Sequence, residues 1–134
     1  MEPISVLENR KKSNIVRINR NSKIFKTIIK AIQEKKGSNI ISLDLRKVHE
    51  SVSDFFIICE ASNPQQIRSI GQFIEEQVKD ICDENSYKHE GYQALQWVLI
   101  DFVNIVVHVM LPETRKFYKI EEMWQDGDSK EHND

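Results

Sequence analysis

Two aspartates, Asp44 and Asp101, stand on predicted strands and are the residues best placed to hold a divalent cation. Metal-assisted phosphoryl transfer needs carboxylates that converge on one site. Each of these two residues stands alone on its strand, and the Asp126-Gly-Asp128 pair belongs to the C-terminal tail. A small metal-dependent nucleotidyltransferase or nuclease therefore stays an alternative function, and it requires Asp44 and Asp101 to meet.

Other catalytic signatures are weak. A phosphate-binding loop needs clustered glycines, whereas the glycines here are scattered singly, at positions 37, 71, 91 and 127. Cys59 and Cys82 each lie in an apolar pattern, which favours small buried side chains over a disulfide or a metal pair. No local signature joins either thiol to a histidine base. We therefore expect no catalytic residues, no cofactor and no metal.

Residues 97–111 are almost unbroken apolar and β-branched, with interruptions at Asp101, Asn104 and His108. This pattern predicts two strands and a tight turn, which form the centre of a sheet. A two-residue loop would pair Trp97 with His108 and Asp101 with Asn104. Alternation then assigns one face to the core, with Val98, Ile100, Ile105, Val107 and Val109. The other face carries Trp97, Leu99, Asp101, Val106, His108 and Met110.

This second face is predicted to point outward as a docking surface. Tryptophan is enriched at binding hot spots, and an apolar anchor with an acidic rim suits a basic protein partner. Asp54, Glu90 and Asp101 would supply the acid. The alternatives are an ordinary core tryptophan, a structural histidine at 108, and loop hydrogen bonding by Asp54 and Glu90. A third function, a homodimeric interaction module, would use the same face for self-association.

The elements around the hairpin alternate between helix and strand. Apolar residues at helical spacing predict a helix that starts after Asn21 or Ser22 and stops at Gly37. Residues 40–45 and 55–59 read as strands, the second buried on both faces. Asn63 and Pro64 predict the start of a second, amphipathic helix. A turn-rich segment at 83–92 follows, and a short helix after Pro112 is expected to fold its aromatic residues back on the sheet.

The chain has 134 residues and a formal net charge of −2. This size suits one domain, which we place at residues 22–124. Residues 1–21 are basic and are predicted to form a flexible arm, with ribosomal RNA contact as an alternative, while the acidic residues 125–134 are predicted to be disordered. No apolar run is long enough to span a bilayer, and the N-terminal sequence does not resemble a signal or transit peptide, so we expect no membrane contact and a cytoplasmic location.

Several blocks resemble the ribosomal silencing factor family, also called Iojap-related, over about residues 22–124. They are residues 40–46, 53–59, 90–91, 97–101, 106–109 and 115–121, followed by Trp124. The resemblance implies an α/β fold of the α+β type: a mixed, about five-stranded sheet flanked by helices, nucleotidyltransferase-like without catalytic residues. It also implies binding to the large ribosomal subunit through ribosomal protein number fourteen, which blocks subunit joining and lowers translation when nutrients are scarce.

The resemblance extends to individual residues. The positions that match the family motif are Trp97, Asp101 and His108 on the hairpin, with Asp54, Glu90, Gly91, Arg115 and Tyr118 around it. We add Leu99 and predict these residues, apart from Gly91, as the partner-binding set. Two departures stand out: Ala61 replaces a usual glycine, and Val103-Asn104 replaces the usual Gly-Asp of the hairpin turn.

Overall fold

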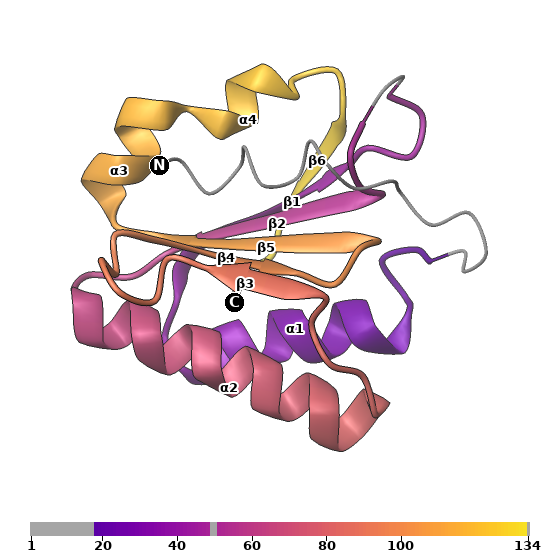
Figure 1. Ribbon diagram of the computed structural model, residues 1–134. Coiled ribbons are helices and arrows are strands. Elements are labelled where there is room, and N and C mark those ends of the chain that lie inside the picture. Colours follow the sequence, from indigo (N-terminus) through magenta and orange to yellow (C-terminus); the bar gives the residue numbers. More distant parts are fainter. Residues whose placement is uncertain (1–17, 49–50, 134) are drawn as a thin grey trace.

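The computed structural model describes residues 18–48 and 51–133. Its centre is a mixed six-stranded sheet with the order β3-β4-β5-β2-β1-β6. Helices α1 (Lys23–Glu34) and α2 (Pro64–Cys82) cover one face, and α3 (Pro112–Tyr118) and α4 (Ile120–Met123) lie over the other (Figure 1). The predicted mixed sheet flanked by helices is confirmed. No helix in the described part of the chain is long and apolar enough to cross a membrane.

The strands are β1 (Ser38–Asp44), β2 (Phe55–Glu60), β3 (Lys88–Glu90), β4 (Trp97–Asp101), β5 (Ile105–Met110) and β6 (Asp128–Glu131). β2 and β5 are parallel neighbours at the centre of the sheet, and the other pairs are antiparallel. Every residue of β4 and β5 is buried, as is β2 up to Cys59. Continuous apolar runs are what a strand covered on both faces requires.

The predicted helix starts are confirmed, and one predicted stop is wrong. Ser22 is the residue before the first turn of α1, although its side chain makes no capping hydrogen bond. At the start of α2, the Asn63 side chain accepts a hydrogen bond from the Gln66 N–H at 2.9 Å. The left-handed residue after α1 is Lys36 (φ 65°), not Gly37. Gly37 is needed for a different reason: an added Cβ would lie 2.5 Å from Cγ2 of Ile32.

The hairpin register differs from the prediction by two residues. Trp97 pairs with Met110, Leu99 with His108, and Asp101 with Val106. The reason is that the turn lies one residue further along the chain, at Val103-Asn104, where the Phe102 N–H donates to the Ile105 carbonyl oxygen at 2.8 Å. A shift of two preserves side-chain alternation, so both predicted faces are confirmed. The face with Val98 and Ile100 packs in the core under α1 and α2, and the face with Trp97 and Leu99 packs in a second core.

The described residues on either side of 22–124 make contacts with the sheet. Residues 128–131 form β6, which pairs with β1 through backbone hydrogen bonds. Backbone pairing with a distant strand leaves no pattern in the sequence, so this strand was not predicted. His132 Nε2 lies 2.7 Å from Oγ of Ser42. Ile18 is buried, and the Arg20 guanidinium donates to the Asp128 carboxylate at 3.1 Å. The rest of the predicted basic arm, residues 1–17, lies outside the described residues. β3 within the turn-rich segment was also not predicted.

Candidate functional site

Trp97 is buried, which corrects the prediction that its indole points outward. Only 4% of the residue is exposed, since α3 and α4 cover this face of the hairpin. The Tyr118 ring lies 5.0 Å from the Trp97 ring, centroid to centroid. Self-association through this face, the homodimer alternative, is wrong for the same reason. Leu99 is also fully buried, because it lies on the same covered face.

His108 is a buried, neutral side chain. Its Nδ1 accepts a hydrogen bond from Nε1 of Trp97 at 3.1 Å, so the proton of the neutral ring belongs on Nε2. Burial lowers the pKa of His108 to about 3. Within the described residues, Nε2 has no hydrogen-bond partner. A base that stays neutral and enclosed at physiological pH serves packing here, which favours the structural reading of this histidine.

Asp54 and Asp101 lie in a loop network and do not form an acidic rim. They are 7% and 1% exposed. Asp101 Oδ1 accepts the Val103 N–H at 2.7 Å, and Asp54 Oδ2 accepts the Asn104 side-chain amide at 2.7 Å. Asn104, one of the departures from the family pattern, therefore joins the loop before β2 to the hairpin turn. Asp54 and Asp101 therefore do not supply the exposed acid that the sequence predicted.

Asp44 and Asp101 do not meet, which removes the basis of the metal-dependent alternative. They lie on β1 and β4, with β2 and β5 between them, a lateral separation of about 14 Å at the usual strand spacing. Asp44 is bound instead by Arg46, whose Nη2 lies 2.7 Å from Oδ2. Although burial raises the pKa of Asp44, hydrogen bonds from Arg46 and the charges of Arg46 and Arg20 hold it below its usual value.

Arg115 connects α3 to the sheet beneath it. It is 8% exposed, and its guanidinium donates to the Asn39 carbonyl oxygen at 2.7 Å. Nη1 also lies 3.2 Å from Glu60 Oε2, and Nε lies 3.0 Å from Glu121 Oε2. These contacts join α3 to β1, β2 and α4. A buried guanidinium with two carboxylates positions the helix rather than reaching a partner.

Of the remaining predicted residues, Tyr118 and Glu90 are half-buried. The Phe117 ring contacts the Tyr118 ring, with centroids 4.9 Å apart. Glu90 lies 3.6 Å from the Lys88 amine on the edge strand β3. The structure thus groups Trp97, His108 and Tyr118 beneath or within α3 and leaves Glu90 at the sheet edge.

The exposed apolar residues over this face were missed by the sequence prediction. Phe117 is 77% exposed and Met123 is 63% exposed, although both were expected to fold back on the sheet. Arg115 and Tyr118 are three residues apart and share the inner side of α3, so Phe117 must point away from it. This spacing was the available signal. We call Lys116, Phe117, Lys119 and Met123 the α3–α4 surface.

A hollow lies beside Phe117. Its volume is about 610 Å³, and it is lined by Pro112, Glu113, Lys116, Phe117 and Lys119. A second hollow of about 480 Å³ shares Pro112, Lys116 and Lys119 and reaches Arg115 and Glu121. Protein-binding surfaces combine apolar area with charged groups around it, and the lining of these two hollows has that composition.

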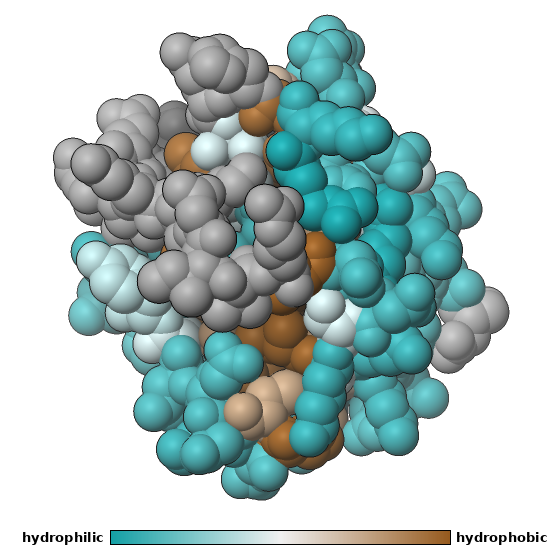
Figure 2. Space-filling model, turned by 90° about the vertical axis from the view of Figure 1, so that its right-hand side faces the viewer, coloured by the Kyte–Doolittle hydropathy of each residue, from teal (hydrophilic) through white to brown (hydrophobic). Residues whose placement is uncertain are grey.

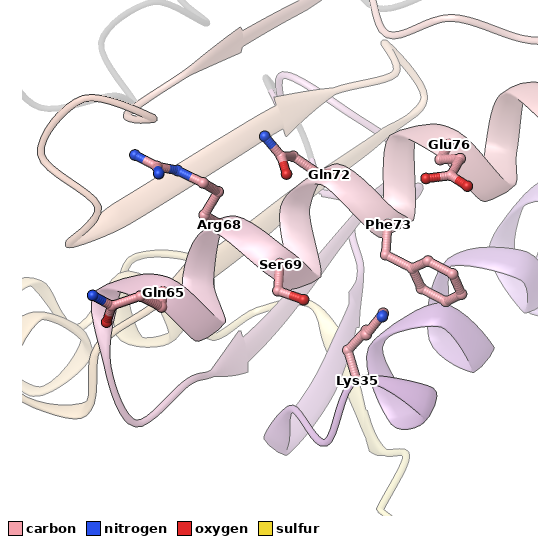
Figure 3. A pocket seen from close by; sticks show the side chains of 7 residues that line it. All are labelled: Lys35, Gln65, Arg68, Ser69, Gln72, Phe73 and Glu76. Atoms are coloured by element: carbon pink, nitrogen blue, oxygen red, sulfur yellow. The ribbon is translucent and has the colours of Figure 1, made fainter.

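Two other surfaces are weaker candidates. The hollow along α2 in Figure 3 has a volume of about 280 Å³, but Arg68 and Gln72 point away from Lys35, whose amine lies 4.6 Å from the centre of the Phe73 ring. Figure 2 shows a hydrophobic band at the end of the molecule that includes the C-terminus of α2. Ile81, near that terminus, is 44% exposed. Neither surface brings polar groups together around a ligand.

Comparison with known proteins places this geometry in a family context. The family model described as "Ribosomal silencing factor during starvation" matches residues 19–134. Ribosomal silencing factor RsfS of Bacillus subtilis is 33% identical over 107 residues, which cover 78% of this chain and 86% of that protein. Mouse mitochondrial assembly of ribosomal large subunit protein 1 is 32% identical over 74 residues, 54% of this chain and 32% of that protein. A crystal structure from Chromobacterium violaceum superposes with a TM-score of 0.73 at 32% identity, covering 77% and 84% of the two chains.

Proposed function

Because this chain belongs to the family of ribosomal silencing factors, we propose that it binds the large ribosomal subunit through ribosomal protein number fourteen and sterically blocks joining of the small subunit. Translation then falls under nutrient limitation, in the cytoplasm, by occupancy of a site and without catalysis. The mouse relative is named for assembly of the ribosomal large subunit, which supports that subunit as the partner.

The docking face that we propose is the α3–α4 surface. The exposure of Phe117, at 77%, is the observation that carries this assignment. A large apolar side chain at that exposure, next to a hollow and flanked by Lys116 and Lys119, has the properties of a binding anchor. An interface of standard size needs about 800 Å² from each partner, so neighbouring residues must contribute as well.

Most of the partner-binding residues predicted from sequence would act by supporting this surface. The Tyr118 ring contacts the rings of both Phe117 and Trp97, and the Trp97 indole donates a hydrogen bond to His108. Arg115 holds α3 to the sheet. Loss of any of these side chains would let α3 move and would weaken docking without the loss of a direct contact.

Cosedimentation with purified large subunits, followed by a subunit-joining assay, tests the proposal. We expect Phe117→Ala to weaken binding to large subunits by about 2 kcal/mol or more, over tenfold in affinity, because truncating a central aromatic anchor commonly has that effect. The thermal stability of the variant should stay close to wild type, since Phe117 contributes little to the core.

Ile81→Ala is the matched control. Ile81 is also an exposed large apolar residue, but it lies on α2, which covers the opposite face of the sheet. The Ile81→Ala variant should bind large subunits like wild type. If Phe117→Ala also binds like wild type, docking at the α3–α4 surface is ruled out. Failure of the wild-type chain to cosediment, or to inhibit joining, would contradict the function itself.

A further inference from the structure

The β6 strand is held to the sheet by few contacts. All of its residues are exposed, and it is the last strand of the sheet in the described chain, so β1 is the strand that pairs with it (Figure 1). Segments with few buried apolar contacts open more readily than the central strands of a sheet. The side-chain contacts of this segment therefore decide how firmly it stays on the sheet.

These side-chain contacts converge on Ser42 of β1, which is fully buried. Its Oγ lies 2.7 Å from Nε2 of His132, the residue that follows β6, and it accepts a hydrogen bond from Nε of Arg20 at 2.9 Å. The same guanidinium engages Asp128 at the start of β6, with 3.1 Å between Nη1 and Oδ2 and 2.8 Å between Nη2 and the carbonyl oxygen. One buried hydroxyl group thus connects β1 to both ends of β6.

The contact between Ser42 and His132 suits a neutral imidazole. The Ser42 oxygen accepts from Arg20, so the hydroxyl proton is directed to Nε2 of His132, and the proton of the neutral ring lies on Nδ1. A second proton on the ring would turn Nε2 into a donor. Two cationic groups would then donate to one oxygen, and the buried hydroxyl proton would lose its acceptor, which is unfavourable.

The charged groups that act on His132 from the described residues also oppose its protonation. Burial lowers the pKa of His132, and the charges of Lys130 on the same strand and of Arg20 lower it further. The α1 helix contributes two uncharged groups. The Phe25 ring lies 5.6 Å from the imidazole ring, centroid to centroid, and the Gln33 side chain donates to the His132 carbonyl oxygen at 2.7 Å.

We propose that Ser42 and His132 form a proton-sensitive latch, in which neutral His132 holds β6 on β1 and protonation of His132 releases β6. The contribution of the neutral ring to this attachment is fully present above about pH 6.5 and is lost as the pH falls below that value, because the folded pKa is the lower one. His108 differs, since it lies in the buried second core and becomes accessible to protons only when the sheet itself opens.

Release of β6 would reach the α3–α4 surface, and this step rests on the proposed function. Only residues 124–127 join α4 to β6. The Trp124 ring packs on Phe56 at 5.7 Å between centroids, and the Gly127 N–H donates to the Trp124 carbonyl oxygen at 2.9 Å. When β6 leaves the sheet, α4 loses its attachment on the C-terminal side. A docking surface that includes Met123 is then less fixed, so binding should weaken.

Hydrogen exchange of the full chain, followed by NMR at about pH 7 and about pH 5.5, tests the latch. We expect the protection factors of the β6 amides, and of the His132 N–H that donates to the Ile40 carbonyl oxygen, to fall by up to about tenfold over this interval, because release takes up one proton. Each protection factor refers to the intrinsic exchange rate at the same pH, so the direct effect of pH on exchange cancels. The β2 amides report opening of the whole fold and should be protected far more strongly.

His132→Gln keeps an acceptor for the Ser42 hydroxyl but does not titrate, so β6 protection in this variant should be the same at both pH values. His89→Gln is the matched control, since His89 is a half-exposed histidine on β3 at the opposite edge of the sheet. It should keep the pH dependence of wild type. Thermal melts at about pH 7 check that both variants are folded. Equal pH dependence in wild type and His132→Gln, or β6 amides as strongly protected as those of β2, would overturn the latch.

Cosedimentation with large subunits at the same two pH values tests the link to docking. Wild type should lose affinity at the lower pH by a larger factor than His132→Gln does, and the ratio of the two affinities cancels effects of pH on the ribosome. A ratio that does not change with pH, when exchange has confirmed the latch, overturns the link to the α3–α4 surface. Failure of wild type to cosediment at either pH contradicts the proposed function instead, and the exchange result stands apart from it.

Discussion

The Trp97 indole donates a hydrogen bond to Nδ1 of His108 across 3.1 Å, although the two residues are not cross-strand partners. Trp97 lies opposite Met110, and the bond runs diagonally over one face of β4 and β5. Phe56 closes the cluster, with its ring 4.6 Å from that of His108. This buried polar contact fixes the surface on which α3 and α4 rest.

The burial of His108 makes stability depend on pH. Its folded pKa is about 3, below the unfolded value of 6.5, so between these values the unfolded chain binds a proton that the native state does not. The contribution of neutral His108 to the free energy of unfolding is fully present above about pH 6.5 and is lost as the pH falls toward 3. From pH 7 to pH 5 the loss should be about 2 kcal/mol.

Urea denaturation at the two pH values measures this loss. His108→Gln keeps an acceptor near Trp97 but does not titrate, so its stability should change less over the same interval. His132, whose pKa is lowered by burial and by Lys130 and Arg20, contributes in the same direction in both proteins. Equal pH dependence in wild type and variant would show that His108 is not buried in the neutral form.

Trp97→Ala should destabilise the fold before it affects any partner. Removing a buried indole commonly costs about 3–5 kcal/mol. Trp97→Phe retains much of the packing but leaves Nδ1 of His108 without its donor, so a smaller loss, about 1–3 kcal/mol, is expected. Chemical denaturation of both variants gives the comparison, and a Trp97→Ala protein as stable as wild type would contradict the packing described for α3.

Val103→Gly should stabilise the protein. Val103 has φ 73°, a left-handed conformation that is strained for a β-branched residue. The hydrogen bonds of residue 103 to Asp101 and Ser53 use backbone atoms, so glycine retains them. After the entropic cost of glycine, a gain of about 1 kcal/mol is expected.

Val103→Ala is the matched control, since it removes β-branching but keeps a Cβ at positive φ. Its stability in a thermal melt should fall between those of wild type and Val103→Gly. A glycine variant that is less stable than wild type would show that Val103 makes packing contacts that outweigh the strain.

Gly91→Ala should be strongly destabilising. Gly91 has φ 98°, and an added Cβ would lie 2.0 Å from the Trp97 carbonyl oxygen, so the backbone itself must move. We expect a loss of more than about 2 kcal/mol in urea denaturation. Ala94→Ser, an exposed position in the same connection, should be close to neutral. A Gly91→Ala protein of wild-type stability would refute the close approach.

Arg115→Met should destabilise the protein by about 3–5 kcal/mol, because Glu60 and Glu121 would be left facing each other without their cation. Adding Glu60→Gln and Glu121→Gln to this variant should recover part of the stability. Denaturation of the single and triple variants measures both effects. If the triple variant is no more stable than the single one, carboxylate repulsion is not the cause.

By itself, the sequence was sufficient for the two long helices, for the four strands other than β3 and β6, and for the division of the hairpin into two faces. Periodicity records which side of a helix or strand is apolar, and a register error of two residues leaves that division intact. The family blocks and the capping residues Asn63 and Pro64 are likewise local signals. Edge strands such as β3 and β6 carry no such pattern, since their partners lie far away in sequence.

Tertiary structure alone decided what covers each face. Trp97, Asp101 and His108 form a motif that reads equally well as an exposed patch or as a buried cluster, and only the position of α3 and α4 makes them buried. The same placement turns Phe117 outward. Alternation tells which residues share a side of a sheet, but solvent access depends on packing between segments distant in the chain, and a short-range pattern does not encode that packing.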